Sequence, residues 1–484
     1  MSQKRVSIGE LCEAIWQIER EEDLYNWEVM GVKLWPLVRF RIFYNLTKNA
    51  DMYKWKSTVF VLPDWVERWQ GKPGDEVLWK YTHGWRWHLR KLIPEAWKDP
   101  RAVKMLKADS LVSPFSNRGP DGIDHHTVPI LEALGDRALR IGMGGWDAAS
   151  EHPSFGLLQR RIRRWHRVWS VIVRIGVKKA DYEKYARVIK FLEDFTGSST
   201  APYNRFPRWA VRNYLMDGVG WRRLFRRIGL KRMYIVNASR MNMQGAMQDI
   251  GGRVIELQNG VFSKYNLQFS WPGRPNIPYI PDEIWTWGKF WTDGIDNSGL
   301  QEIVVAGANP EFSRIRDLAF AGAEGYARKP NSIVVMSQPL IGVELFRSAI
   351  KIAKAMPKHT VVFKSHPKDL QEEFDEVIAE LGTPPKNFSF AEEGVGSLQL
   401  IAQSELCLGV FSATLIEAAG LGCKVAILKL AGWEHLARLV DGGFAAGFAT
   451  AEEFIAGFDG VPAPGDPYYF YGEAADYKRL TAER

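Results

Sequence analysis

Residues 360–367 have the sequence TVVFKSHP, and residues 405–417 have the sequence ELCLGVFSATLIE. Each stretch begins with a short apolar run, residues 360–363 and 405–410, that predicts a buried strand. Apolar runs of this length that alternate with helix-period segments are typical of βαβ units on a parallel sheet. Ligands of such sheets bind outside the carboxyl ends of the strands. The polar residues after each run are therefore expected at a ligand site.

Two hydroxyl residues, Ser412 and Thr414, stand where the second strand turns into a predicted helix over residues 415–421. Their hydroxyls and the nearby N–H groups would face the positive end of that helix, which favours an anion. The structural alternative is that Ser412 only caps the helix.

The first stretch ends in Lys364, His366 and Pro367. The imidazole of His366 can donate to a phosphate or ribose oxygen, Lys364 can add a point charge, and Pro367 fixes the backbone that follows. The structural alternative is a plain turn at the end of the strand. Both groups of polar residues, 364–367 and 412–414, follow strands of one Rossmann-like unit. Together they favour a nucleotide pocket.

The same alternation of strands and helices continues through the C-terminal half. Ser337 follows another predicted strand, residues 333–336, and is expected to touch a donor or an acceptor. The remaining predictions in this half are strands at 387–390 and 424–429 and helices at 344–355, 371–381, 398–403 and 433–440.

A strand that ends in His-Pro, followed by a strand that ends in S-x-[ST] and opens a helix, resembles the GT-B-fold glycosyltransferases of bacterial surface polysaccharides. The resemblance is to sialyltransferase-like and Kdo-transferase-like enzymes and to CDP-glycerol transferases, and it spans roughly residues 234–430. In the users of CMP-sugars these motifs hold the nucleotide and its phosphate. The resemblance therefore implies that role for His366, Pro367, Ser412 and Thr414. It also implies that Glu417, on the helix after Ser412, reaches the ribose hydroxyls.

Two carboxylates are candidates for the catalytic base. Sialyltransferase-like enzymes carry a base in an acidic-acidic-Gly motif, and residues 120–122 (PDG) keep one of its acids, Asp121. Residues 256–260 (ELQNG) resemble an E-x-Q-H-G segment with Asn259 in place of His, which makes Glu256 the second candidate. The structural alternative for Asp121 is a plain Asp-Gly turn, and that for Glu256 is a capped strand end.

The predicted fold class is α/β, with two Rossmann-like domains of the GT-B type and a Trp-rich helical and β extension before them. The extension covers residues 1–105 and includes a hairpin with its turn at Met30-Gly31. The first Rossmann-like domain covers 106–320 with a basic helical insertion at about 155–232, the second covers 321–462, and a tail at 463–484 is expected to fold back. The first domain is predicted to have strands at 110–113, 139–143, 233–237, 253–257, 283–290 and 303–307 and helices at 128–134 and 243–250.

The 484 residues carry a net charge of +8, 20 Trp and 3 Cys. The scattered cysteines and the absence of a secretory signal favour a reducing cytoplasm. No apolar run reaches the roughly 18–20 residues that a membrane-spanning helix needs. The positive charge favours an anionic partner, and the sequence has no zinc spacing or RNP-like motif to support nucleic acid.

The charge gathers in residues 158–179 and 221–228, where Arg alternates with Trp on amphipathic segments. This pattern is typical of a helix that lies on an anionic membrane surface. A helix that packs on the protein core with its basic side in water has the same pattern, and the alternatives stay open.

The sequence thus predicts a glycosyltransferase that moves a sugar from a nucleotide-activated donor, a CMP-ulosonic acid or an NDP-sugar, to a surface glycan or lipid-linked acceptor. We expect inversion without a metal ion or other cofactor, because no Asp-x-Asp cluster lies near the phosphate signals. The alternatives are a GT-B-like sugar-nucleotide epimerase and a non-catalytic membrane-surface protein that keeps the fold.

Overall fold

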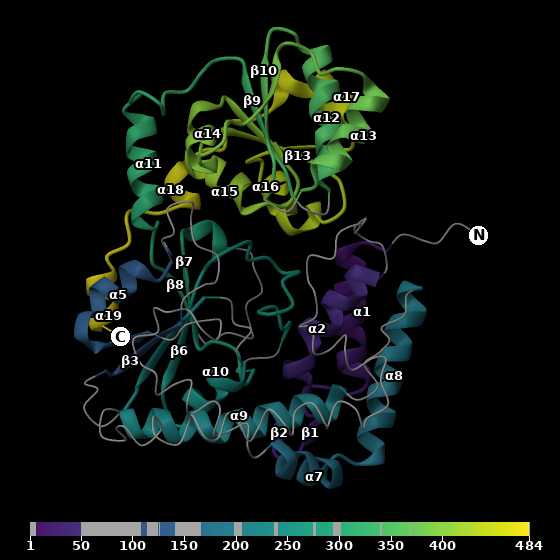
Figure 1. The fold of residues 1–484 in the computed structure, drawn as a ribbon, viewed down its shortest axis with the longest axis vertical. Coiled ribbons are helices and arrows are strands. Elements are labelled where there is room, and N and C mark those ends of the chain that lie inside the picture. Colours follow the sequence, from purple (N-terminus) through teal and green to yellow (C-terminus); the bar gives the residue numbers. More distant parts are fainter. Residues whose placement is uncertain are drawn as a thin grey trace, which may run out of the picture.

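The computed structural model has two lobes, each built on one six-stranded parallel sheet (Figure 1). It describes residues 6–49, 108–113, 124, 126–140, 166–197, 206–236, 241–273, 277–293, 302–338, 341–367 and 369–483. Asp121, one of the two predicted bases, lies outside the described residues.

The C-terminal lobe has the strand order β11-β10-β9-β12-β13-β14, with every neighbouring pair parallel. Its strands are β9 (Ser332–Met336), β10 (Thr360–Lys364), β11 (Phe388–Phe390), β12 (Leu406–Gly409), β13 (Lys424–Leu428) and β14 (Ala446–Phe448). Its helices are α12 (Gly342–Ala355), α13 (Gln371–Leu381), α14 (Ser397–Gln403), α15 (Ala413–Gly420), η4 (Trp433–Leu436), α16 (Ala437–Asp441), α17 (Ala451–Gly457) and η5 (Phe458–Gly460). Counted along the chain this is the strand order 3-2-1-4-5-6 of the Rossmann fold, whose topological switch point lies between β9 and β12.

The N-terminal lobe has the order β4-β3-β5-β6-β7-β8, again parallel throughout. Its strands are β3 (Ser110–Ser113), β4 (Ala138–Arg140), β5 (Arg232–Ile235), β6 (Arg253–Leu257), β7 (Glu283–Thr286) and β8 (Glu302–Val305). Its helices are α5 (Val128–Leu134), η2 (Gly135–Arg137), α9 (Phe206–Ile228), α10 (Met241–Gln248), η3 (Lys289–Trp291) and α11 (Pro310–Phe320), which leads to the other lobe. Because its central strands β3, β5, β6 and β7 are mostly buried, side chains on both of their faces lie in the core, as is typical of a parallel sheet.

An extension of helices packs beside the N-terminal lobe (Figure 1). From the predicted extension it comprises α1 (Ile8–Glu21), the hairpin β1 (Glu28–Val29) and β2 (Val32–Lys33) and α2 (Leu34–Asn49). From the predicted basic insertion it adds α7 (His166–Gly176) and α8 (Lys179–Thr196), and the name extension is used below for all of these elements. Met30 and Gly31 have φ of 56° and 76°, as the predicted two-residue hairpin turn requires. Trp16, Trp27 and Trp35 of the extension are buried in one continuous core with the N-terminal lobe.

The predicted fold class is therefore confirmed: the protein is α/β, with two Rossmann-like parallel sheets in the two-lobed arrangement of the GT-B type and a helical and β extension. For one basic segment the structure decides between the two alternatives. Residues 221–228 are the end of the long helix α9, and Trp221, Leu224 and Phe225 are buried, so this segment packs on the protein core. The segment 158–179 is divided, because α7 ends at Gly176 and α8 begins at Lys179.

The chain after the C-terminal lobe returns to the N-terminal one. α18 (Pro467–Phe470) packs on α15, and α19 (Tyr477–Glu483) packs on α5 (Figure 1). The N–H of Gly472 donates to Trp287 O at 2.8 Å, and Ala308 and Ala474 form a parallel bridge. Among the described residues no helix is long and apolar enough to cross a membrane.

Candidate functional site

The loops at the switch point of the C-terminal sheet are joined by a side chain. Gln338 follows β9, Phe411 follows β12, and the Phe411 N–H donates to Gln338 Oε1 at 2.9 Å. A Gln that reaches across a switch point fixes the spacing of the two loops. Ser337 and Ser412, predicted from the sequence, are the neighbours of these residues and are therefore held at one crevice.

Ser412 is the N-cap of α15, as its structural alternative predicted. Its Oγ accepts from the Thr414 N–H at 3.3 Å and from Thr414 Oγ1 at 2.7 Å. The Ser412 hydroxyl keeps its own proton to donate, and the first-turn amides of a helix have no intrahelical acceptor. Capping and anion binding are therefore compatible at this helix end.

The Ser337 hydroxyl is buried and has no hydrogen-bond partner among the described residues. It lies beside the first turn of α12, where an ideal Cβ on Gly342 would come within 2.9 Å of Ser337 Oγ and 2.8 Å of Asp369 Oδ1. Any larger residue at this position would force one of these two side chains to shift. Because the Asp369 carboxylate already lies at the positive end of α12, a phosphate is favoured at α15 instead.

Lys364 ends β10, the neighbour of β9 in the sheet, and His366 follows it. The His366 N–H donates to Asp369 Oδ2 at 2.8 Å and the Asp369 N–H donates to His366 O at 2.9 Å, so the predicted turn forms here. Lys364 Nζ donates to Val395 O at 2.9 Å, which leaves two of its three protons for a ligand. Pro367 is exposed directly after His366. Ligand roles for these three residues stay predictions.

Glu417 lies one turn into α15, half-buried, and no hydrogen bond to its carboxyl occurs within the described residues. Burial raises the pKa of Glu417 to about 7. Its charge acts on Tyr471 of the returning tail, whose buried hydroxyl also lacks a partner in the described part of the chain. Near neutral pH the Glu417 carboxyl is therefore able both to donate and to accept a hydrogen bond.

In the N-terminal lobe, the polar groups at the ends of β6 and β7 bond to one another. Gln258 Oε1 accepts from the Trp287 N–H at 3.1 Å, and Gln258 Nε2 donates to Gly260 O at 3.0 Å, so this amide orders the ends of β6 and β7. The cavity that Gln258, Trp287 and His126 help to line has a volume of about 10 Å³, room for one water. Glu256, on β6, is only 2% exposed, the reverse of what a base that meets a substrate hydroxyl needs. Its role stays a prediction.

Sequence patterns missed one contact between the lobes. Ser263 Oγ lies 3.2 Å from Nδ1 of His435, on η4. Burial lowers the pKa of His435 to about 4, so the ring is neutral at pH 7. Because His435 comes shortly after β13, its position at a strand's carboxyl end is the signal that could have found it.

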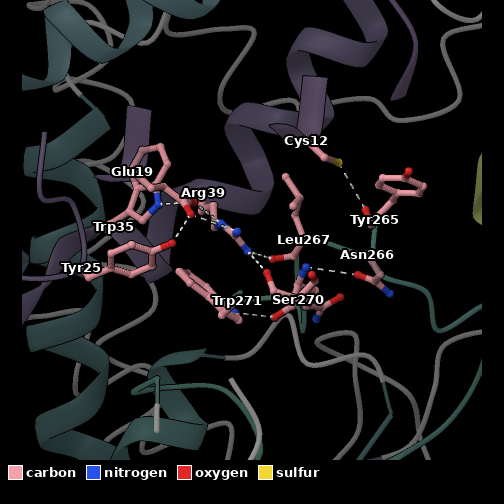
Figure 2. A network of polar contacts seen from close by, with 11 residues as sticks. Cys12, Glu19, Tyr25, Trp35, Arg39, Tyr265, Asn266, Leu267, Ser270 and Trp271 are labelled. Carbon is pink, nitrogen blue, oxygen red and sulfur yellow. Dashed lines mark hydrogen bonds and ion pairs between the residues drawn. The ribbon is translucent and has the colours of Figure 1, made fainter. Parts of the chain in front are cut away.

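The segment that carries Ser263 is held from its other side by the extension (Figure 2). Arg39 of α2 donates through Nη1 to Leu267 O and to Ser270 O, each at 2.6 Å, and its guanidinium lies 3.9 Å from the ring centre of Trp271. Cys12 of α1 contacts Tyr265 O at 3.8 Å. The extension therefore determines where residues 263–271 meet the C-terminal lobe.

No group of three or more His, Cys, Asp and Glu side chains that could hold a metal ion occurs in the part of the chain that the structure describes. The candidate site brings together the N-terminus of α15, the hydroxyls of Ser337 and Ser412, the carboxyl of Glu417, and Lys364 and His366 at the end of β10.

No family model matches this sequence, and neither does any curated protein. Among solved structures, the chain is similar to the UDP-GlcNAc 2-epimerase from Neisseria meningitidis bound to UDP-GlcNAc, with a TM-score of 0.42 and 10% identity over 77% of this chain and 98% of that one. The UDP-GlcNAc 2-epimerase from Rickettsia bellii has a TM-score of 0.43 and 12% identity over 78% and 95%. A glycosyltransferase from Rickettsia africae has a TM-score of 0.39 and 12% identity over 73% and 87%. Similarities this distant transfer neither a substrate nor a catalytic residue to this chain.

Proposed function

We propose that this protein is a glycosyltransferase that binds a nucleotide-activated sugar at the β9–β12 switch point and transfers the sugar to a surface glycan or lipid-linked acceptor. The observation that carries the proposal is the pair of joined loops there. They bring together the buried Ser337 hydroxyl, which has no partner in the part of the chain that the structure describes, and the N-terminus of α15, capped by Ser412. Such a crevice is where doubly wound sheets bind nucleotides.

Each polar group has a role in the proposal. The diphosphate or monophosphate of the donor lies at the first turn of α15, where the Ser412 hydroxyl donates to it and Thr414, which donates to Ser412 Oγ, orients that hydroxyl. Glu417, one turn further, meets the ribose hydroxyls, and its protonation state suits either side of such a hydrogen bond. Lys364 and His366 add positive charge and a donor from the side of β10.

In the reaction, a carboxylate takes the proton of an acceptor hydroxyl whose oxygen attacks the anomeric carbon of the sugar. The bond from that carbon to the phosphate oxygen breaks, the configuration inverts, and the nucleotide leaves with the electron pair. The α15 end stabilises the charge that develops on the phosphate. Asp121 is the first candidate for the base and Glu256 the second, and no metal ion is required.

The finer assignments follow from the same proposal. The donor is a CMP-ulosonic acid or another nucleotide sugar, and the product belongs to capsule or lipopolysaccharide. Cys12, Cys407 and Cys423 are all buried free thiols, which fits a reducing compartment such as the cytoplasm.

The test is the rise in thermal midpoint with CMP, CDP, UDP, GDP and dTDP, because a ligand that binds only the folded state stabilises it. We expect one nucleotide to give a rise that Ser412→Ala removes. Thr450→Ala is the matched control, since Thr450 caps α17 in the same lobe by accepting from the Glu453 N–H at 3.1 Å. Both variants lose a cap, but only the first loses the nucleotide effect.

A null result with all five nucleotides, or equal effects of the two variants, contradicts the nucleotide site. Turnover then separates the activities. A transferase releases nucleotide from its sugar donor only as acceptor is consumed, whereas an epimerase converts the donor with no acceptor present.

A further inference from the structure

The helix α7 presents aliphatic side chains to solvent. Val171, Ile172 and Ile175 are 59%, 41% and 79% exposed, whereas Val173 and Val177 are buried and fix the helix to the body of the extension. The exposed three lie within little more than one turn and on the side away from the two buried valines. Single exposed aliphatic residues are ordinary, but a cluster on one short helix calls for a partner.

Basic residues lie within this cluster and directly after it in the chain. Arg174 lies within it and is exposed, and Lys178 and Lys179 follow at the end of the helix, also exposed. Lys179 pairs with Glu183 at 3.2 Å. In sequence, residues 158–179 contain eight Arg and Lys and no Asp or Glu. A partner for this helix must therefore accept aliphatic side chains and carry negative charge.

We propose that the α7 face, defined as Val171, Ile172, Arg174 and Ile175, docks on an anionic lipid surface. An interfacial helix needs only to insert one apolar face between headgroups, while its basic residues meet lipid phosphates. A stable interface with a second copy needs about 800 Å² from each partner, more than three aliphatic side chains supply. α7 lies at the end of the molecule away from the C-terminal lobe, so docking there leaves that lobe clear of the membrane (Figure 1).

The test is co-sedimentation of the full chain with vesicles of phosphatidylcholine alone and of phosphatidylcholine mixed with phosphatidylglycerol. We expect binding only to the mixed vesicles and its loss at high salt. Replacing both Ile172 and Ile175 with Asp is expected to lower the partition coefficient roughly ten-fold or more, since it removes the inserted side chains and adds two negative charges. Arg174→Glu is expected to lower it several-fold.

Phe320→Asp is the matched control, because Phe320 is 51% exposed on α11, away from α7. It adds a charge in place of an exposed apolar side chain and is expected to leave vesicle binding unchanged. All variants are expected to keep the thermal midpoint, since each changed side chain is exposed.

Three outcomes overturn the proposal: no binding to the mixed vesicles, unchanged binding of the double variant, or an equal loss in Phe320→Asp. A concentration-dependent dimer that the double variant abolishes would assign the α7 face to a second copy instead and would also overturn it. None of these readouts depends on nucleotide binding, so the two proposals stand or fall separately.

Discussion

Arg39 and Glu19 form an ion pair whose side chains are 1% and 0% exposed, at the junction of the extension and the N-terminal lobe. Burial of a charge pair is tolerable only when hydrogen bonds satisfy both ions. Here Trp35 Nε1 and Tyr25 OH donate to the two Glu19 oxygens at 2.8 and 2.5 Å, while Arg39 also donates to two backbone carbonyls (Figure 2). The network joins α1 and α2 to residues 267–271.

Removing one partner of this pair leaves the other charge buried and unpaired. We therefore expect Arg39→Ala to lower the free energy of unfolding by about 3–5 kcal/mol. Urea unfolding at pH 7 measures it.

The exposed pair of Arg187 and Glu22, at 2.8 Å in the same extension, is the matched control. Arg187→Ala is expected to lower the free energy of unfolding far less than Arg39→Ala does, because solvent screens the pair. Equal losses in the two variants would show that burial does not set the strength of the Arg39 pair.

Gly342 tests the packing of the crevice. In Gly342→Ala the new methyl group would lie within 3 Å of Ser337 Oγ and Asp369 Oδ1, so the turn at Asp369 must shift. We expect a loss of about 1–3 kcal/mol in the free energy of unfolding. Gly460→Ala, where no atom lies within 4 Å of the new Cβ, is expected to change it by less than about 0.5 kcal/mol. A tolerated Gly342→Ala would contradict the close approach.

His435 predicts a fall in stability on the acid side. Its pKa is about 4 in the folded chain, below its ordinary 6.5, so the unfolded chain binds more protons between these values. The free energy of unfolding is expected to fall as the pH drops from about 6.5 to about 4, and to fall less in His435→Gln. Ser263→Ala should keep the wild-type slope, since burial rather than the hydrogen bond lowers the pKa. Parallel pH curves for the wild type and His435→Gln would refute the assignment.

For Glu417 we expect the opposite pH dependence of the free energy of unfolding. Its folded pKa of about 7 lies above its ordinary 4.5, so the folded chain binds the extra proton. Its contribution to stability is full below pH 4.5 and is lost as the pH rises through 7. Glu417→Gln, which is neutral throughout, is expected to remove this loss. The difference in unfolding free energy between wild type and variant, measured from pH 4 to 8, checks the sign.

The parallel strands could be predicted from the sequence because strands that are buried on both faces consist of consecutive apolar residues. Residues 110–113 and 253–257 match β3 and β6, and 371–381 matches α13. β14 was missed, because its three half-buried residues, Ala446–Phe448, make no such run. For the basic segment at 221–228 the sequence could not decide between a membrane surface and the protein core, because its four Arg and four apolar residues suit both. The Trp221 ring nevertheless stacks on Phe225 inside the core.

The sequence predicts which residues of the candidate site follow a strand, but it does not predict the contacts between them. Ser337 and Ser412 could be placed there from the order of strands and helices. The bond from Phe411 to Gln338, and the use of the Gln258 amide by Trp287, join residues 73 and 29 positions apart. Such contacts depend on which strands become neighbours, and periodicity carries no information on that. The same holds for the extension, which the sequence suggested to be an appended module and which shares the core of the N-terminal lobe.

The return of the tail has a consequence for how the protein is made. α19 packs on α5, and Arg232 Nη1 donates to Thr481 O at 2.8 Å, so the first lobe is completed by residues translated after the whole second lobe. While the ribosome is still making the C-terminal sheet, the earlier lobe has an open flank that exposes apolar side chains to chaperones. Residues 6–320 alone are expected to be aggregation-prone, and a separate peptide of residues 463–484 is expected to rescue their solubility.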